Sequence, residues 1–292
     1  MRTIAMGAVL VSAALAPAAG EVETRTLAVA DGVEIAYDVR GAGSTTLVFV
    51  HCWACDREFW REQLDAFAGS HRVVSLDLPG HGASTADRES WSIPGLGEDV
   101  GALVEALDLQ RVVLVGHSMG GPVSLAAAAR LAGRVVGVVC VDTVHDADGS
   151  MPPGVAEQLA ASFEQDFEGA MRQMVPAMFP PAADPGVRDW VAERALGTDR
   201  AAAVALLRAF EDVDLPGLLS GAGVPIRGVN AHPLPPVIPE TKVETNRKYA
   251  DYGAVLIEGV GHYLQLEKPE EFNAALRAAI AEIESATNGG SR

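Results

Sequence analysis

The stretch Arg111-Val-Val-Leu-Val-Gly-His-Ser-Met-Gly-Gly121 decides the fold. Its apolar half, residues 112–115, is a short β-branched and aliphatic run of the kind buried in a parallel sheet. The run breaks into Gly-x-Ser-x-Gly, and an alanine-rich helix pattern then opens with Pro122. A serine between two glycines on a strand-to-helix turn is typical of a nucleophile elbow. We therefore predict that Ser118, at the apex of this turn, is a nucleophile.

Short apolar runs separated by helical stretches extend outward from the elbow. The other runs are residues 46–50, 72–76, 135–141, 226–229 and 254–257. Before them, residues 24–29 and 33–39 alternate apolar and polar side chains around Asp31-Gly32, which predicts a hairpin at a sheet edge. Strands alternating with helices predict an α/β fold, a mostly parallel sheet with helices on both faces. The expected helices are residues 58–67, 96–107, 119–131, 240–249 and 270–283.

The stretch from 144 to 215 interrupts this alternation. It contains no convincing strand and is predicted to form helices. These are residues 155–167, 169–178, 187–196 and 200–210, with Pro152-Pro153 and Pro180-Pro181 as breaks. Because it is inserted after the sixth strand, we expect an all-helical lid of residues 144–215 over the site. The core would then comprise residues 21–143 and 216–286.

Composition and charge limit the classes of partner. A chain of 292 residues with 49% hydrophobic and 21% charged residues can form one full α/β core. The formal net charge of −17 argues against nucleic acid and anionic membranes. Within residues 1–20, Arg2 precedes an apolar run that ends among small residues, which predicts a cleaved signal peptide. The run is short for a membrane span, so we expect an exported protein, periplasmic or secreted, without stable membrane insertion.

The three cysteines fit export without requiring it. Cys52-Trp-Ala-Cys55 has the spacing of a redox motif but lacks the sequence context of a thioredoxin. In an oxidising compartment, Cys52 and Cys55 could form a local disulfide. Cys140 lies in an apolar strand pattern and is expected to be a small buried hydrophobic residue.

Three further motifs accompany the elbow in a fixed order. They are Val48-Phe-Val-His-Cys-Trp53, Asp77-Leu-Pro-Gly-His-Gly-Ala-Ser84 and Gly259-Val-Gly-His-Tyr-Leu-Gln-Leu-Glu-Lys-Pro269. With these motifs the chain resembles the α/β-hydrolase superfamily, in particular its serine esterases with a helical lid, over essentially the whole mature sequence. The resemblance implies that the backbone amides of Trp53 and Met119 form the oxyanion hole. Cys52 stands where this superfamily usually has Gly.

One of the seven histidines is predicted to be the general base. His262 follows the last strand in a glycine-rich loop, which delivers an imidazole to the carboxyl edge of the sheet beside Ser118. His117 flanks the nucleophile and should help to hold the elbow, while His51 and His81 should form local hydrogen bonds. No pair of histidines has metal-ligand spacing with carboxylates, so we predict neither a metal nor a cofactor.

The acid of the triad departs from the commonest pattern. In most relatives it follows the strand equivalent to residues 226–229, but the turn Asn230-Ala-His-Pro-Leu-Pro-Pro236 contains neither Asp nor Glu. The superfamily's alternative location is the end of the preceding strand, where Asp142 stands. We therefore predict Asp142 as the residue that orients His262. The alternative is that Asp142 only caps the turn, with Asp146, Asp148 or Glu240 as rival acids.

The resemblance implies a serine hydrolase that cleaves a small or medium-sized carboxylic ester through an acyl-enzyme. Lid and loop side chains would contact this small-molecule substrate: Trp53, His145, Met171, Met174, Met178 and Phe179, with Met151 beside them. The methionines could equally bury the lid against the core. Because one fold supports many functions, two alternatives remain. One is a slow-turnover ligand-binding or sensing protein, and the other is C–C bond hydrolysis or acyl transfer.

Overall fold

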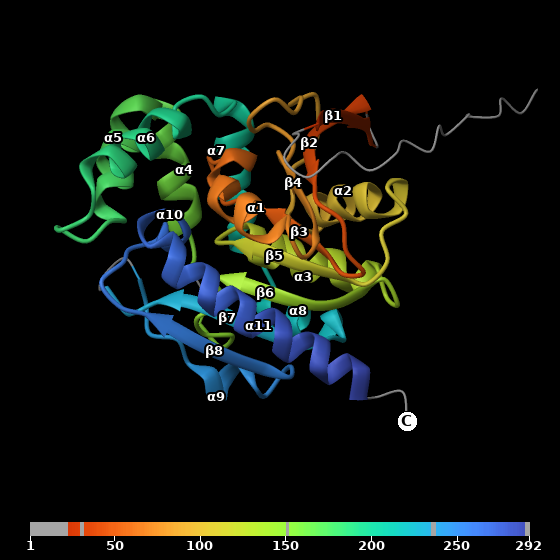
Figure 1. Cartoon of the computed structure of the whole chain (residues 1–292). Coiled ribbons are helices and arrows are strands. Elements are labelled where there is room, and N and C mark those ends of the chain that lie inside the picture. Colours follow the sequence, from red (N-terminus) through yellow and green to blue (C-terminus); the bar gives the residue numbers. More distant parts are fainter. Residues whose placement is uncertain (1–22, 30–31, 150–151, 235–237, 290–292) are drawn as a thin grey trace, which may run out of the picture.

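A computed structural model describes residues 23–29, 32–149, 152–234 and 238–289. Within these ranges, eight strands form one sheet in the order β1-β2-β4-β3-β5-β6-β7-β8 (Figure 1). The strands β3 to β8 pair in parallel, while β1 and β2 are antiparallel at one edge. This arrangement confirms the predicted mostly parallel sheet with an edge hairpin. The bounds are β1 (Glu23–Ala28), β2 (Glu34–Arg40), β3 (Thr46–Val50), β4 (Arg72–Leu76), β5 (Val112–His117), β6 (Val135–Val141), β7 (Ile226–Ala231) and β8 (Tyr252–Ile257).

Apolar side chains cover both faces of the sheet. Along β5, Val112 and Leu114 enter one hydrophobic cluster, and Val113 and Val115 enter the other, because successive strand residues point to opposite faces. The helices α2 (Ile93–Ala106), α3 (Gly120–Arg130) and α8 (Leu215–Ala222) contribute to the first cluster. The opposite face is covered by α1 (Arg61–Phe67) and α11 (Pro269–Gly289). The sheet is therefore covered by helices on both faces. In such sheets a functional site lies at the carboxyl ends of the strands.

Between β6 and α8, the described residues form four α-helices and one short helix. They are α4 (Val155–Gln165), α5 (Phe167–Ala177), α6 (Pro185–Ala195) and α7 (Arg200–Ala209), followed by the short helix η3 (Phe210–Asp212). Asp166, Asp184 and Asp199 cap α5, α6 and α7, each accepting a hydrogen bond from a first-turn backbone N–H. Figure 1 shows these helices gathered beyond the arrowheads of the central strands. We call residues 155–212 the helical insertion.

The structure departs from the predicted helices near the C-terminus. The helix predicted over 240–249 is reduced to α9 (Val243–Asn246). The reason is that the preceding residues are held by tertiary hydrogen bonds: the Thr241 hydroxyl contacts Asn230 and His145, and the Lys242 N–H donates to the carbonyl oxygen of His145. The helices α8 and α10 (Leu264–Glu267) were not predicted. The helix predicted over 58–67 is divided into η2 (Arg57–Trp60) and α1, and α11 extends beyond the predicted end.

Two predictions fall outside the described residues. These are the signal peptide of residues 1–20 and the placement of Met151 in the lid. Among the residues that are described, every helix is either too short or too polar to cross a lipid bilayer.

Candidate active site

Ser118 occupies a strained turn between β5 and α3. Its φ angle of 51° lies in the left-handed region, where side chains other than glycine cost free energy. The Ser118 N–H donates to the carbonyl oxygen of Val141 at 2.9 Å, which ties the turn to the neighbouring strand. A Cβ atom at Gly116 would collide with the carbonyl oxygen of Gly120, so the tight turn requires glycine there. This geometry places the serine at the carboxyl edge of the sheet, as a nucleophile elbow does.

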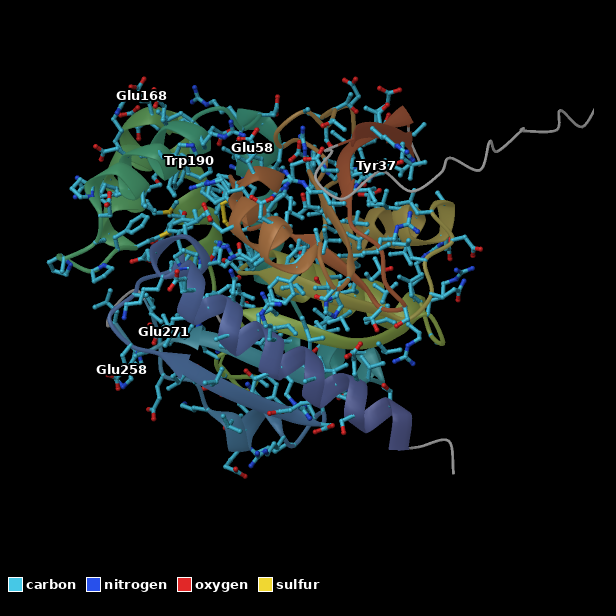
Figure 2. The ribbon with its side chains drawn as sticks, in the orientation of Figure 1. Tyr37, Glu58, Glu168, Trp190, Glu258 and Glu271 are labelled. Atoms are coloured by element: carbon cyan, nitrogen blue, oxygen red, sulfur yellow. A yellow bond between two sulfur atoms is a disulfide. The ribbon has the colours of Figure 1, made fainter. Side chains whose placement is uncertain are left out.

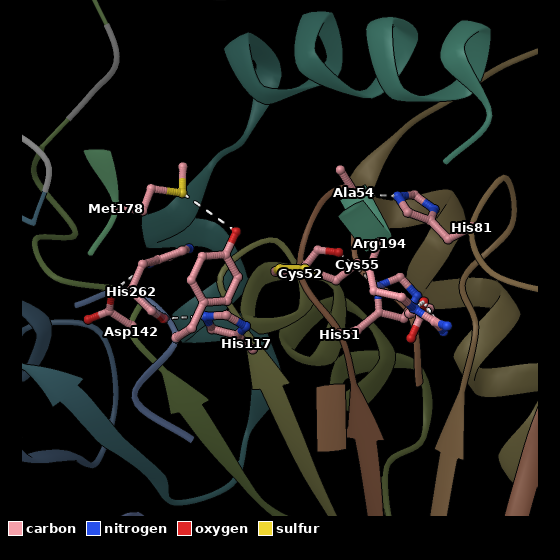
Figure 3. Close-up of a disulfide and its surroundings, with 12 residues drawn as sticks. His51, Cys52, Ala54, Cys55, His81, His117, Asp142, Met178, Arg194 and His262 are labelled. Atoms are coloured by element: carbon pink, nitrogen blue, oxygen red, sulfur yellow. Dashed lines mark hydrogen bonds and ion pairs between the residues drawn. A yellow bond between two sulfur atoms is a disulfide. The ribbon is translucent and has the colours of Figure 1, made fainter. Parts of the chain in front are cut away.

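His262 and Asp142 form a hydrogen-bonded pair at the same edge (Figure 3). Nδ1 of His262 lies 2.6 Å from Oδ2 of Asp142, whose side chain is buried at the end of β6. Oδ1 of Asp142 accepts a hydrogen bond from the Ala231 N–H at 2.9 Å. Burial by itself raises the pKa of Asp142, but the hydrogen bond and positive charge of His262 outweigh it and hold this pKa below its usual value. The carboxylate therefore stays ionised and favours the His262 tautomer with its proton on Nδ1.

Ser118 and His262 line one small cavity of about 40 Å³. Of the side chains predicted to contact substrate, four line it: Trp53, Met171, Met174 and Met178. Val175, Ala195 and Tyr263 also line it and were not predicted, because only the tertiary packing brings them there. A larger hollow of about 350 Å³ lies beside Arg194 and Glu193, but it contains neither the serine nor the histidine. The chemistry therefore places the candidate site in the smaller cavity.

Two backbone N–H groups near Ser118 are available as hydrogen-bond donors. Trp53 lies in the turn that follows β3, and Met119 directly precedes α3. Within the described part of the chain, neither the Trp53 N–H nor the Met119 N–H meets a protein acceptor. Met119 also lies at a helix N-terminus, where the helix dipole favours negative charge. These two amides are the predicted donors to an oxyanion formed at Ser118.

Two predicted substrate contacts lie elsewhere. His145 lies behind Asp142, with Nε2 3.8 Å from Oδ1 of Asp142 and Nδ1 3.0 Å from the Thr241 hydroxyl. Phe179 stacks on Tyr263 with ring centroids 5.1 Å apart. Neither residue lines the cavity. Phe179 therefore lies behind Tyr263, and His145 behind Asp142, as seen from the cavity.

The rival acids have other partners or face solvent. Asp146 and Asp148 each contact a lysine at 2.7 Å, Lys242 and Lys248 respectively. Glu240 is exposed. In the described residues no group of three or more His, Cys, Asp or Glu side chains converges as metal ligands do. Of the four candidate acids, Asp142 alone is hydrogen-bonded to His262.

Buried polar groups fix the backbone around His262. Nδ1 of His117 accepts a hydrogen bond from Nε2 of Gln265 at 3.2 Å, so Nε2 of His117 carries the proton and donates to the carbonyl oxygen of His262 at 2.8 Å. Burial, reinforced by the charge of His262, lowers the pKa of His117 to about 3, which keeps it neutral. The Glu267 carboxylate accepts the Gly261 N–H at 2.9 Å. Gln265 and Glu267 were not predicted, although both belong to the motif that contains His262.

The helical insertion contacts the loop that follows β3 (Figure 2). Trp190 of α6 packs on Phe59, with ring centroids 4.8 Å apart. Arg194 donates to Asp56 at 2.8 Å and lies 3.3 Å from Glu58. Trp190 and Glu58, labelled in Figure 2, mark the two sides of this junction. The contacts hold the insertion over the cavity.

Comparison with known proteins gives the same fold. The model of the alpha/beta hydrolase family matches residues 47–275. Pimeloyl-(acyl-carrier protein) methyl ester esterase of Aeromonas hydrophila is 28% identical over 241 residues, which cover 77% of this chain and 91% of that protein. The bromoperoxidase structure from Bacillus anthracis matches with a TM-score of 0.80 at 22% identity, over 89% of this chain and 100% of the other.

One similar protein is much longer than the segment that matches this chain. The dihydrolipoyllysine-residue acetyltransferase component of the acetoin cleaving system of Pseudomonas putida is 33% identical over 153 residues, or 52% of this chain. The match spans only 39% of that protein, so its activity as a whole is not carried over. The family model, by contrast, covers most of this chain. The chain therefore belongs to the α/β-hydrolase family.

Proposed function

We propose that the protein is a serine hydrolase that cleaves carboxylic esters of small or medium size through an acyl-enzyme. The observation that carries this proposal is the pair His262–Asp142, 2.6 Å apart, in which His262 lines the same cavity as Ser118. A buried carboxylate, an imidazole and a serine on a strained elbow are the three parts of the triad mechanism. Membership of the hydrolase family supports the reaction class, and the similarity to an ester esterase supports an ester as the substrate.

Acylation starts at Ser118. Because Nδ1 of His262 is directed at Asp142, Nε2 is free to take the proton of Ser118 Oγ as that oxygen attacks the ester carbonyl carbon. The carbonyl oxygen then becomes an oxyanion, which the N–H groups of Trp53 and Met119 stabilise. When the tetrahedral intermediate collapses, the imidazolium returns its proton to the leaving alcohol. The acyl group remains on Ser118.

Deacylation repeats these steps with water. His262 takes a proton from a water molecule, whose oxygen attacks the acyl carbon, and the same two amides hold the second oxyanion. The proton then passes from His262 to Ser118 Oγ as the carboxylic acid leaves. Asp142 stays ionised throughout and orients the imidazole, consistent with its buried position and lowered pKa.

We also propose that the helical insertion acts as a lid and sets the size of the acyl group. Met171, Met174 and Met178 come from this insertion and line the cavity beside Ser118. Methionine side chains are flexible and can adapt to different apolar groups. The cavity of about 40 Å³ supports a small acyl group in the structure as described, with larger groups requiring movement of the methionines.

A panel of chromogenic esters with increasing acyl length tests the proposal. The wild-type protein should hydrolyse the shortest members with a burst of alcohol equal to the enzyme concentration if deacylation is slower than acylation. Ser118→Ala should remove turnover and leave the circular dichroism spectrum unchanged. The absence of hydrolysis across the panel, together with no labelling by a fluorophosphonate, would rule the proposal out.

The small cavity also favours a second candidate, a ligand-binding or sensing protein with slow turnover. A cavity of about 40 Å³ beneath a packed insertion leaves little room for exchange, so a bound ligand would be released slowly. This alternative predicts one equivalent of released alcohol and then no further turnover over hours. Multiple turnovers within minutes would instead support the hydrolase. Other reactions on the fold, C–C bond hydrolysis and acyl transfer, are tested by replacing the ester with a β-diketone or by adding an alcohol acceptor.

A further inference from the structure

The turn that supplies the Trp53 amide is closed by a covalent bond. Cys52 and Cys55 form a disulfide, with their Cα atoms 5.3 Å apart, and both side chains are buried (Figure 3). The Cys55 N–H also donates to the carbonyl oxygen of Cys52 at 3.2 Å. A hydrogen bond and a disulfide therefore close the same four-residue turn, which contains Trp53 and Ala54. The α/β-hydrolase mechanism proposed above does not explain this crosslink.

Ala54 explains why the turn needs support. Its φ angle of 56° lies in the left-handed region, which is unfavourable for alanine and would suit glycine. Such a residue stays in this region only where its surroundings hold it. If Ala54 relaxed to a right-handed conformation, the adjoining peptide units would rotate. The Trp53 N–H, which belongs to this turn beside the cavity, would then change its direction.

Neutral histidines hold the turn from the core side. Nε2 of His81 accepts the Ala54 N–H at 3.2 Å, and Nδ1 of His81 lies 2.9 Å from the carbonyl oxygen of Pro79. Nε2 of His51 accepts a backbone N–H at 2.8 Å, so its proton is on Nδ1, which donates to the carbonyl oxygen of Cys52 at 2.7 Å. These bonds fix the two ends of the turn. Trp53 itself has one further anchor, from its Nε1 to the carbonyl oxygen of Ala203 in α7 at 2.8 Å.

We infer that the Cys52–Cys55 disulfide is a positioning element, which holds the Trp53 amide in place to stabilise the oxyanion. This inference rests on the proposed ester hydrolysis. It predicts that breaking the crosslink lowers kcat more than it raises KM, because an oxyanion exists only in the transition state and the tetrahedral intermediates. Loss of one oxyanion donor costs on the order of 100-fold to 1,000-fold in kcat. A donor that is misdirected for part of the time should cost less, about tenfold.

The test compares Cys52→Ala, Cys55→Ala and the double variant with Cys140→Ala. Cys140 is buried in β6 away from the turn and provides a matched control for removing a buried thiol. Either single substitution breaks the crosslink, so all three turn variants should lose about the same factor in kcat, with KM changed by about twofold or less. The control should keep wild-type kcat. Independent packing effects of the two side chains would instead multiply in the double variant.

Chemical reduction provides a second measurement on the unaltered chain. A trialkylphosphine breaks the S–S bond and becomes the phosphine oxide, taking its oxygen from water, whose two protons end on Cys52 and Cys55 as thiols. Mass spectrometry after alkylation counts the thiols: one before reduction, from Cys140, and three afterwards. The reduced protein should show the same fall in kcat as the variants. A trifluoromethyl ketone, which forms an oxyanion on the serine, should bind more weakly by a similar factor.

Three results would overturn the inference while leaving ester hydrolysis in place. These are wild-type kcat in folded turn variants, full activity of protein with three alkylated thiols, and three free thiols in active protein before reduction. If the alanine variants do not fold, the phosphine-treated wild type decides between the two outcomes. If the untreated wild type hydrolyses no ester, the proposed function fails first, and this result is distinct from the other three.

Discussion

Acidification from pH 7 to pH 5 should destabilise the fold through three buried histidines. His51, His81 and His117 are fully buried, and burial is the largest cause that lowers their pKa values, to about 4, 3 and 3. In the unfolded chain each returns to about 6.5. The folded-state pKa lies below the unfolded one, so the stabilisation is fully present above pH 6.5. It is lost as the pH falls toward 4, where only the unfolded chain binds the protons.

The size of the effect follows from these values. Each proton that only the unfolded chain binds lowers the free energy of unfolding by about 1.4 kcal/mol for every pH unit below the pKa of the unfolded group. At pH 5 the pH is about 1.5 units below the pKa of the unfolded imidazoles. Each histidine therefore lowers the free energy of unfolding by about 2 kcal/mol, and the three together lower it by about 6 kcal/mol. Single domains have a total stability of about 5–15 kcal/mol. The protein should therefore lose a large part of its stability at pH 5.

Urea unfolding followed by tryptophan fluorescence between pH 5 and pH 8 measures this loss. His81→Asn should reduce the slope of the unfolding free energy against pH by about 1.4 kcal/mol per unit below pH 6.5. The control, His232→Asn, replaces an exposed histidine outside the core and measures the effect of removing any one histidine from the chain. Equal urea midpoints at pH 5 and pH 7 for the wild-type protein would refute the reasoning, as would the same slope in His81→Asn.

Further predictions concern the triad acid, the cavity and export. Asp142→Asn should lower kcat by about 10⁴-fold with little change in KM, because the His262 imidazole is no longer held in the tautomer that accepts the serine proton. If Asp142→Asn keeps its activity and Asp146→Asn loses it, Asp146 is the acid instead. Met174→Ala enlarges the cavity and should shift the preferred acyl chain to longer members of the ester panel, and an unchanged chain-length profile would contradict this. Protein from its natural host should begin near Ala19 or Glu21 by mass spectrometry, and an intact Met1 would disprove signal cleavage.

The sequence predicted those parts of the fold that depend on local pattern. The elbow at Ser118 followed from a β-branched run that ends in Gly-x-Ser-x-Gly, and the structure places a positive φ there. Asp142 was chosen because the turn of residues 230–236 contains no carboxylate, and the structure places it 2.6 Å from His262. The first prediction needed only local pattern, while the second also rested on the resemblance to the α/β-hydrolase superfamily.

Long-range packing accounts for what could not be predicted. The helix expected over 240–249 is short because the Thr241 hydroxyl accepts a hydrogen bond from Asn230. Helix propensities describe local sequence and cannot predict such a long-range contact. The position of His145 behind the acid depends on how the loop after β6 folds back. In the same way, Tyr263 lines the cavity and stacks on Phe179 of the insertion, a contact between residues far apart in the sequence. The spacing of Cys52 and Cys55 allowed a disulfide without requiring one.

The most direct test of the proposed mechanism is the site of covalent labelling by a fluorophosphonate. The reagent should modify one serine per chain, and peptide mass spectrometry should find the adduct on Ser118. His262→Ala should slow the labelling by several orders of magnitude, because the base no longer takes the serine proton. Labelling should also fall in Asp142→Asn, since the imidazole is then misoriented. An adduct on another residue, or no adduct on a protein that still hydrolyses esters, would contradict the assignment of Ser118 as the nucleophile.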